Sequence, residues 1–466
     1  MSRILLIKPN MAHAPEDIPS INPPMGLMYL ASYLRCFDHN RNIKIIDMVL
    51  EEMTPEDILP ILKEFQPDIC GISCLTMNAN NSLRVSEWIK KWNPACHVIF
   101  GGPHPTFMPH KVLESKFVDY CVMGEGEETA HLLISALENN QRHECIEGIG
   151  YRSGDGIALN NRPAALDITR LPWPAYDLIP IKHYWKSKIP SHSGRVKYPE
   201  YMTVMSSRAC PYGCIYCHNI FGKEFRAREP EDFVEEMVML EKNYGVREFH
   251  IIDDVFNLKR ERVFEICERI SQKLSGIAMA FPNGLRTDLL DKETLRVLKK
   301  AGMYYFGAAI ESGSPEIQKM IKKNLDYEKA SQTIKEAAKM GIIVHGFFMM
   351  GFPGETEEQL NMTIDFAKRS SLNTASFFAV TAYPDTELHE IAKQKGISLP
   401  NDFDAYHYHY NTINLTDIPL QRLRLLRKKA YWKFYFNPFR IHKILSMTPR
   451  KVDILTNLKM HVRDFF

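Results

Sequence analysis

The sequence predicts an α/β protein with three parts: an N-terminal, Rossmann-like open parallel sheet, a partial (β/α)6 TIM-like barrel and a mostly helical C-terminal region. Two series of strand-like segments alternate with helix-like segments, which is typical of parallel sheets covered by helices. The chain has 466 residues, more than one average domain needs. We expect the sheet domain at residues 1–150, a connector at 151–200, the barrel at 201–390 and the C-terminal region at 391–466.

The composition is that of a folded globular protein. Hydrophobic residues make up 45% of the chain and charged residues 24%, so a large core is available. The first residues form too short an apolar run for a signal peptide. No stretch approaches the roughly 18 apolar residues that span a bilayer. We therefore expect a cytoplasmic protein.

The N-terminal sheet is expected to bind a ligand at one edge. Its strands are expected at residues 4–7, 43–46, 69–73, 97–100 and 120–122, and its helices at 27–34, 81–92 and 128–137. Ligands of open parallel sheets lie beyond the carboxyl ends of the strands. The loops there are residues 9–10, 73–78, 101–106 and 124–127. Each loop alone is explained by a tight turn, but four loops with glycine, hydroxyl and amide groups at one edge indicate a site for a large polar cofactor.

A second α/β series follows residues 151–200, where we expect little regular structure. Its strands are expected at residues 202–206, 248–252, 279–282, 304–309, 344–350 and 374–380, and its helices at 230–244, 259–274, 292–301, 327–340 and 356–370. Six such repeats predict a partial barrel with its chemistry at the carboxyl ends of the strands.

Three cysteines, Cys210, Cys214 and Cys217, follow the first barrel strand. Three soft thiolates on one tight loop suit an iron–sulfur cluster and leave one iron without a protein ligand. Structural zinc remains an alternative, but it usually takes four ligands from two cysteine pairs, and no second pair follows. His218 as the fourth ligand would strain a tetrahedron. The other seven cysteines are scattered singly, which is typical of reduced thiols.

The cysteine loop, with Tyr216 before its last cysteine, resembles the signature loop of the radical S-adenosylmethionine (SAM) enzymes. Later strand ends resemble the subgroup that carries an N-terminal cobalamin-binding domain; the matching segments are residues 253–256, 284–288, 309–313 and 351–356. The N-terminal segments 23–27, 101–106 and 124–127 are similar to that domain. The resemblance covers about residues 1–390, and both halves agree in their order.

The resemblance implies a [4Fe–4S] cluster on the three cysteines, with SAM on its open iron and a 5′-deoxyadenosyl radical as the product of SAM cleavage. The SAM-binding residues would be Tyr216, Asp254, Arg286, Glu311, Ser312 and Gly351. Tyr216 would line the adenine site, and Arg286 would neutralise the methionine carboxylate. As plainer alternatives, Arg286 pairs with Asp288, Glu311 is a solvated carboxylate, and Gly351 only forms a turn.

Cobalamin is the cofactor that the resemblance implies for the N-terminal domain. The contacts would come from Pro9, Asn10, Gly26, Ser73, Thr76, Gly101, Gly102, Pro103, His104, Thr106, Gly124, Glu125 and Gly126. The Asp-x-His-x-x-Gly motif that supplies a lower histidine ligand in other corrinoid proteins is absent from the sequence. We therefore expect base-off cobalamin, with His104 beside the nucleotide tail or backbone rather than on cobalt.

The activity implied is a class B-like radical SAM methyltransferase that moves a methyl group from SAM via methylcobalamin to an unactivated carbon. The same architecture also resembles anaerobic cyclases or ring-rearranging enzymes, such as a porphyrin cyclase, which transfer no methyl group. A non-catalytic corrinoid or iron–sulfur sensor is a third class, and the complete set of SAM-site segments argues against it.

Basic charge is concentrated near the C-terminus. Residues 421–466 hold twelve Lys and Arg against two Asp, a local charge of about +10, whereas the formal net charge of the whole chain is +2. The basic helix expected at 420–435 could bind an anionic membrane surface or a flavodoxin or ferredoxin electron donor, or it could simply be a solvated face of the protein. No nucleic acid is expected as a partner. We expect a small-molecule substrate, with lipids and tetrapyrroles as candidates. Residues 406–410 form a lid or a packed strand, and a second helical stretch is expected at 452–462.

Overall fold

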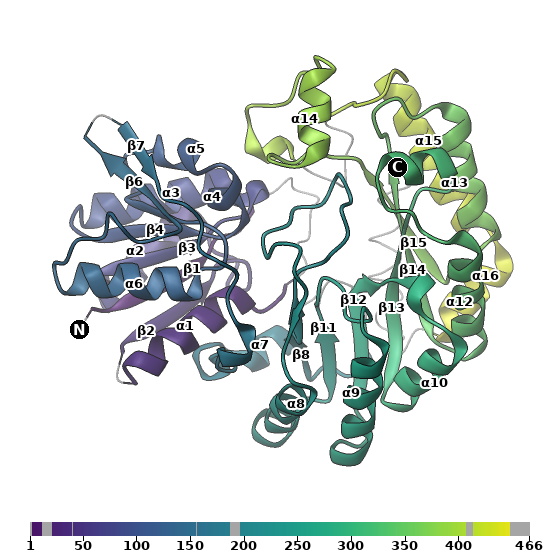
Figure 1. Cartoon of the computed structure of the whole chain (residues 1–466), viewed down its shortest axis with the longest axis horizontal. Coiled ribbons are helices and arrows are strands. Elements are labelled where there is room, and N and C mark those ends of the chain that lie inside the picture. The colour runs from purple at the N-terminus through teal and green to yellow at the C-terminus, as the bar shows by residue number, and fades with distance from the viewer. Residues whose placement is uncertain are drawn as a thin grey trace.

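Two α/β units lie side by side in the computed structural model, with the C-terminal helices against the second unit (Figure 1). The structure describes residues 2–11, 21–39, 41–154, 156–186, 196–406 and 413–447. The expected α/β class, with an N-terminal sheet, a partial barrel and a helical C-terminal region, is confirmed. Residues 407–410 of the expected lid and the expected helix at 452–462 lie outside the described residues.

The N-terminal sheet has seven strands in the order β2-β1-β3-β4-β5-β6-β7. They are β1 (Ile4–Lys8), β2 (Ile43–Asp47), β3 (Ile69–Ser73), β4 (His97–Gly101), β5 (Tyr120–Val122), β6 (Ile149–Ser153) and β7 (Gly156–Leu159). The helices are α1 (Met25–Phe37), α2 (Ile58–Phe65), α3 (Ala79–Trp92), α4 (Pro103–Phe107), α5 (Pro109–Leu113) and α6 (Glu127–Glu138). Because side chains alternate along a strand, Ile4 and Leu6 join one core with α1 and α6, while Leu5 and Ile7 join another with α2 and α3.

The sheet is parallel from β2 to β5, but β6 and β7 are antiparallel. Our expectation of irregular structure from residue 151 onward is therefore wrong at its start. Gly154, with a φ of 56°, lies in the turn between these two strands, and the short, partly exposed strands carry too weak an apolar signal to be recognised from the sequence. The short helix α7 (Ile181–Lys186) adds further regular structure to this segment.

The barrel contains six parallel strands, and each strand pairs with the next one along the chain. They are β8 (Tyr201–Val204), β11 (Glu248–Ile251), β12 (Ala278–Leu285), β13 (Met303–Glu311), β14 (Ile343–Met350) and β15 (Thr374–Ala379). The helices are α8 (Pro230–Tyr244), α9 (Arg260–Lys273), α10 (Lys292–Lys300), α11 (Pro315–Met320), α12 (Tyr327–Lys339) and α13 (Glu357–Arg369). A two-stranded ribbon of β9 (Ser207–Arg208) and β10 (Arg226–Ala227) follows β8.

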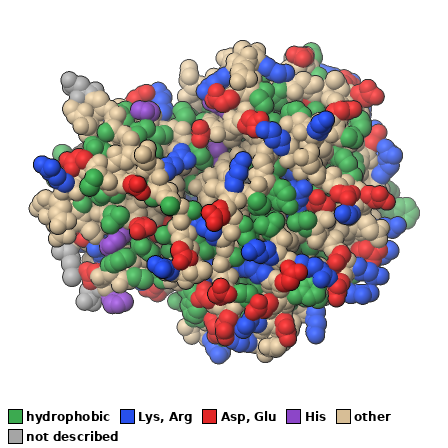
Figure 2. All heavy atoms as spheres, in the orientation of Figure 1, with side chains coloured by type: hydrophobic (Ala, Val, Ile, Leu, Met, Phe, Trp, Pro, Cys, Tyr) green, Lys and Arg blue, Asp and Glu red, His purple; other side chains and the backbone are tan. Residues whose placement is uncertain are grey.

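Three further helices complete the described chain: α14 (Glu387–Gln394), α15 (Leu420–Tyr435) and α16 (Pro438–Met447). The basic helix α15 packs against α13 and β15, where the Tyr431 hydroxyl accepts a 3.1 Å hydrogen bond from the Phe377 N–H. Lys433 pairs with Asp365 of α13 at 3.5 Å. Acidic and basic side chains are mixed over the barrel helices at the right of Figure 2. In the described part of the chain, every helix is too short or too polar to cross a membrane.

Candidate functional site

The three cysteines lie on the loop that joins β9 to β10, at the carboxyl end of the first barrel strand. Cys210 and Cys214 are partly exposed, and Cys217 is exposed. The Cys217 N–H donates to the Cys214 carbonyl at 3.2 Å, which closes a tight turn. The thiols therefore share one short segment, where a cluster can be reached from the surface.

The electrostatics of this loop fit an iron–sulfur cluster. A hydrogen bond from Cys217 and the positive charge of Lys323 together lower the pKa of the Cys214 thiol to about 6, against burial, which raises it. Thiolates are the form that ligates iron. Among the described residues, no three His, Cys, Asp or Glu side chains form a group that could hold a single metal ion; a cluster makes no such demand, because each thiolate binds a different iron.

Two aspartates after β11 hold the backbone that leads into the cysteine loop. Asp253 accepts hydrogen bonds from Ser206 N at 2.7 Å and from the hydroxyls of Ser206 and Ser207. Asp254 accepts from the Ala209 N–H at 3.0 Å, where Ala209 has a left-handed φ of 73°. The Asp254 carboxyl, which we expected to bind SAM, is therefore engaged by the residue before Cys210.

Arg286 lies beside the cysteine loop and also makes the plainer contact. Its guanidinium pairs with Asp288 at 3.0 Å and stacks on the ring of Tyr212 at 3.8 Å from the centroid. Tyr212 lies between Cys210 and Cys214, so this stacking ties the end of β12 to the loop. No pattern in the sequence predicts the contact with Tyr212.

The remaining expected SAM residues differ in how much of each side chain is engaged. Glu311 is buried at a left-handed φ of 67° and pairs with Lys323 at 3.4 Å. The Ser312 hydroxyl bonds to the Thr363 hydroxyl at 3.1 Å and accepts from the Ser314 N–H.

Two more of these residues lie near Phe352. The ring of Tyr216 is 6.0 Å from that of Phe352. Gly351, with a φ of 108°, donates its N–H to the carboxyl of Glu355 at 2.8 Å. Its backbone conformation is one that favours glycine.

Aromatic side chains face the barrel interior. Along β14, Val344, Phe348 and Met350 are buried, whereas the alternate residues His345 and Phe347 are only partly buried. The Phe347 ring lies over Gly307 of β13, where a Cβ would collide with it, and it is 5.9 Å from the Phe378 ring of β15. Our sequence reasoning missed this surface, although the alternation along β14 could have indicated it.

Open space surrounds part of the expected cobalamin edge. A Cβ placed on Gly26, Gly101 or Gly124 would meet no atom within 4 Å, so a large ligand can approach the backbone there. Ser73 and Gly101 end neighbouring strands, and Pro103 opens the short helix α4.

Hydrogen bonds knit the loops of this edge together. Thr106 donates its hydroxyl to the Gly102 carbonyl at 2.7 Å and accepts from the Gly124 N–H at 2.9 Å. After β1, the Asn10 side chain bonds to the Met53 carbonyl, and the Pro9 carbonyl accepts from Asn78. Gly126 precedes the first residue of α6. The expected cobalamin residues thus gather at one edge of the sheet.

His104 is buried at this edge. Its Nδ1 lies 3.3 Å from the Thr76 hydroxyl, and its ring meets Phe403 edge to face at 4.4 Å. Burial and the neighbouring His218 lower the pKa of His104 to about 4, so the imidazole is neutral at neutral pH.

Glu125 does not point freely toward a ligand. Its carboxylate pairs with Arg226 at 2.7 Å and with Arg208 at 3.0 Å, and it accepts the Leu166 N–H at 2.9 Å. The side chain that we expected to bind cobalamin is therefore engaged by residues on both sides of the cysteine loop.

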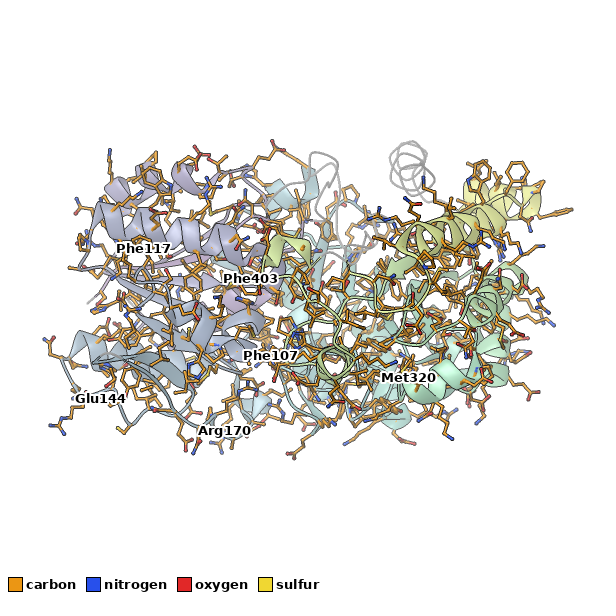
Figure 3. All side chains as sticks on the ribbon, turned by 90° about the horizontal axis from the view of Figure 1, so that it is seen from above. Phe107, Phe117, Glu144, Arg170, Met320 and Phe403 are labelled. Carbon is orange, nitrogen blue, oxygen red and sulfur yellow. The ribbon has the colours of Figure 1, made fainter. Side chains whose placement is uncertain are left out.

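The two units meet beside the last cysteine. Phe107 of α4 stacks on His218, with ring centroids 4.6 Å apart and planes 11° apart. Figure 3 shows Phe107 and Phe403 between the two units. Because His218 follows Cys217 directly, the sheet edge expected to hold cobalamin touches the loop expected to hold the cluster.

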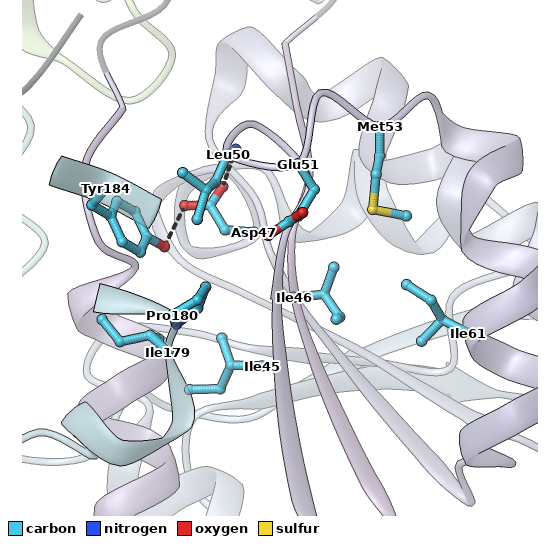
Figure 4. Close-up of a pocket in the computed structure, with 10 residues that line it drawn as sticks. All are labelled: Ile45, Ile46, Asp47, Leu50, Glu51, Met53, Ile61, Ile179, Pro180 and Tyr184. Atoms are coloured by element: carbon cyan, nitrogen blue, oxygen red, sulfur yellow. Dashed lines mark hydrogen bonds between the residues drawn. The ribbon is translucent and has the colours of Figure 1, made fainter. Parts of the chain in front are cut away.

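A cavity of about 430 Å³ lies elsewhere, beside the edge strand β2 (Figure 4). Its wall includes Ile46, Ile61 and Pro180, and the Tyr184 hydroxyl donates to Asp47 at 2.9 Å. It shares no residue with the cysteine loop or with the expected cofactor contacts. The cavity therefore lies where β2 packs against the segment around α7, and we do not assign it to the cofactor site.

The fold and this site define a cysteine-loop barrel enzyme with a ligand-binding sheet domain at its mouth. A model of the radical SAM superfamily matches residues 204–367, and a B12-binding domain model matches residues 16–134. A protein of Pyrococcus horikoshii named as an uncharacterized methyltransferase is 33% identical over 445 residues, which are 94% of this chain and 93% of that protein. The chain belongs to the radical SAM superfamily, in the group whose barrel follows a B12-binding domain.

Two solved structures share the fold of the chain. The cobalamin-dependent S-adenosylmethionine radical enzyme OxsB, with aqua-cobalamin and SAM bound, matches with a TM-score of 0.75 and 17% identity, covering 100% of this chain and 76% of OxsB. The radical SAM methyltransferase TsrM from Kitasatospora setae, with cobalamin and a [4Fe-4S] cluster bound, matches with a TM-score of 0.69 and 19% identity, covering 84% and 78%. The expected α/β fold, with an N-terminal sheet followed by a partial barrel, is thus confirmed.

Proposed function

We propose that this protein is a cobalamin-dependent radical SAM methyltransferase that transfers a methyl group from SAM to an unactivated carbon of a small molecule. The observation that carries the proposal is the contact of Phe107 with His218 at 4.6 Å, which brings the cobalamin edge to the cysteine loop. The name of the Pyrococcus horikoshii relative supports methyl transfer over a cyclase reaction.

When bound, the cluster and cobalamin supply the electron that cleaves SAM and the relay for the methyl group. The chain's own residues bind and orient them. Cys210, Cys214 and Cys217 would hold the cluster. The positive charge of Lys323, which pairs with Glu311, would offset negative charge beside them. The proposed contacts for SAM are Tyr216, Arg286, Glu311 and Gly351.

Asp254 and Ser312 are proposed to hold neighbouring segments instead, because the Asp254 carboxylate accepts from the Ala209 N–H and the Ser312 hydroxyl bonds to the Thr363 hydroxyl. On the sheet side, the cobalamin contacts that we propose are the loops after β1, β3, β4 and β5, with Gly26, Gly101 and Gly124 leaving the space. His104, kept neutral by burial, would face the cofactor without adding charge.

The substrate that we propose is a small molecule with a planar or apolar group. Phe347 and Phe378 line the barrel interior, 5.9 Å apart, and Gly284 and Gly307 leave room for the Phe347 ring. Flat apolar surfaces of this kind bind rings and hydrocarbon groups by stacking and burial. Tetrapyrroles and lipids both carry such groups.

The decisive experiment uses anaerobically reconstituted protein with hydroxocobalamin, a chemical reductant, an extract of the host and SAM deuterated in its methyl group. We expect S-adenosylhomocysteine and 5′-deoxyadenosine to form together with a product that carries the deuterated methyl. Formation of 5′-deoxyadenosine without S-adenosylhomocysteine would favour a cyclase. The variant Cys214→Ala is the negative control, and Cys267→Ala, which replaces a buried cysteine of α9, is the matched one.

We propose that a flavodoxin or ferredoxin supplies the electron. Cys217 is exposed, so the cysteine loop offers a donor a route to the cluster. An acidic donor would dock by charge, and its rate of cluster reduction should fall with added salt. Such donors belong to the cytoplasm, where thiols stay reduced, and we propose this location for the enzyme.

A peripheral membrane contact is proposed for the end of α15 and for α16. Phe436 and Phe439 there are 78% and 88% exposed, beside a basic helix, which suits an anionic bilayer surface. Flotation with anionic vesicles should fall when both phenylalanines are replaced by serine. The control Leu132→Ser removes an exposed leucine from α6; equal flotation of all three proteins would disprove the contact.

A further inference from the structure

Both ends of the cysteine loop converge on one carboxylate of the N-terminal unit. Arg208 directly precedes the loop and Arg226 directly follows it, and these residues face each other in the β9–β10 ribbon. Both guanidinium groups bond to Glu125, at 3.0 Å and 2.7 Å. The Glu125 carboxylate therefore fixes the base of the loop from outside the barrel.

The contact is buried and nearly saturated. The side chains of Arg208 and Glu125 are 4% and 9% exposed. Arg208 also donates to Glu127 at 2.6 Å, and it lies between the rings of Tyr29 and Phe221. Arg226 holds the Phe221 carbonyl at 2.8 Å. Charged hydrogen bonds in such a site are directional and strong, since little water competes for them.

Glu125 stands at the carboxyl end of β5, between Gly124 and Gly126. The neighbouring Gly124 N–H bonds to Thr106 in the loop after β4. A displacement of Glu125 would therefore move the edge where cobalamin is expected relative to the loop where the cluster is expected.

We infer that Glu125 is a positioning residue whose ion pairs with Arg208 and Arg226 set the distance between the corrinoid site and the cysteine loop. The inference rests on the proposed function. This positioning role takes the place of the direct contact with cobalamin that we expected for Glu125. Its two carboxylate oxygens already accept hydrogen bonds from the two arginines and from the Leu166 N–H.

The amounts of two products formed from SAM distinguish a positioning role of Glu125 from other roles. Under a low-potential chemical reductant, loss of the methyl group from SAM to reduced cobalamin leaves S-adenosylhomocysteine and depends on where cobalamin lies. Reductive cleavage of SAM takes one electron from the chemical reductant through the cluster and leaves methionine and a 5′-deoxyadenosyl radical. Without substrate, this radical becomes 5′-deoxyadenosine by taking a hydrogen atom from the reductant or buffer, so the step does not depend on cobalamin. Both can be measured without knowing the substrate.

The test compares Glu125→Gln, Arg226→Gln and the double variant with the wild type, each carrying cluster and cobalamin. We expect S-adenosylhomocysteine formation to fall at least tenfold in all three, while 5′-deoxyadenosine formation, iron content and the cobalamin dissociation constant change less than twofold. The double variant should be no worse than the single ones, because they break the same contact.

Glu138→Gln is the matched control, since it removes the buried Arg41–Glu138 pair, 3.0 Å long, within the N-terminal unit. It should keep the wild-type ratio of the two products. Weaker cobalamin binding in Glu125→Gln, or an unchanged product ratio, would overturn the inference. If Glu125→Gln does not fold, Arg226→Gln decides. A wild-type enzyme that makes no S-adenosylhomocysteine would instead disprove the proposed function.

Discussion

The buried carboxyl of Glu355 makes the stability of the fold depend on pH. Glu355 is 2% exposed and accepts hydrogen bonds from the Gly351 and Phe352 N–H groups at 2.8 and 3.0 Å. Its other oxygen has no partner within the described residues. Burial raises the pKa of Glu355 from 4.5 to about 7, against the two N–H bonds that lower it.

The size of the effect follows from these two values. They differ by about 2.5 pH units, and at 1.36 kcal/mol per unit this is about 3 kcal/mol. Between the two pKa values the folded state keeps a proton that the unfolded state has released. The free energy of unfolding therefore falls as the pH rises from 4.5 to about 7, and the loss is complete above that.

Glu355→Gln keeps an oxygen for the two N–H groups but cannot ionise. We expect the stability of the variant relative to wild type to rise by about 3 kcal/mol from about pH 5 to about pH 8. Urea unfolding followed by circular dichroism at several pH values measures this difference, and effects of all other titrating groups cancel in it. Two curves that stay parallel across this range would refute the assigned cause.

Three substitutions test the barrel. Gly307→Ala should displace the Phe347 ring, because its Cβ would collide with that ring. We expect a raised KM for the substrate, with unchanged 5′-deoxyadenosine formation in the absence of substrate, and an unchanged KM would contradict the proposed role of Phe347 in substrate binding. Gly302→Ala combines a φ of 113° with a Cβ 2.8 Å from the Ile277 carbonyl oxygen, so it should lower unfolding stability by about 1–3 kcal/mol. Phe348→Ala, at a fully buried position, should lower it by about 3–5 kcal/mol; losses below about 1 kcal/mol in these two would contradict the packing.

Local signals were sufficient for the barrel helices. Helix α8 begins at Pro230 and ends before Gly245, which has a left-handed φ of 77°, as expected for residues 230–244. Proline fits the first turn of a helix, and glycine fits the left-handed position after its end. Such signals act within a few residues, so the sequence carries them in full.

Long-range contacts could not be derived in this way. β12 extends to Leu285, beyond the expected end at residue 282, because it pairs with β13 through a register shift that its own residues do not reveal. For Glu125 the loop could be placed at the sheet edge, but the arginines that engage it lie 83 and 101 residues away in the sequence. The residue type indicated a polar contact, and only the fold identifies the partner.

Backbone strain marks the same end of the barrel as the cysteines. Ala209 follows the ribbon strand β9, and Glu311 ends the barrel strand β13; their left-handed φ values are 73° and 67°. This conformation raises the free energy of a non-glycine residue by about 1–3 kcal/mol. Each is held by a polar contact, Ala209 by Asp254 at 3.0 Å and Glu311 by Lys323 at 3.4 Å. Local preference and fold therefore disagree beside Cys210 and at Glu311, where the proposed cluster and its ligand would require a fixed geometry. Such conflicts are expected at the functional site of an enzyme.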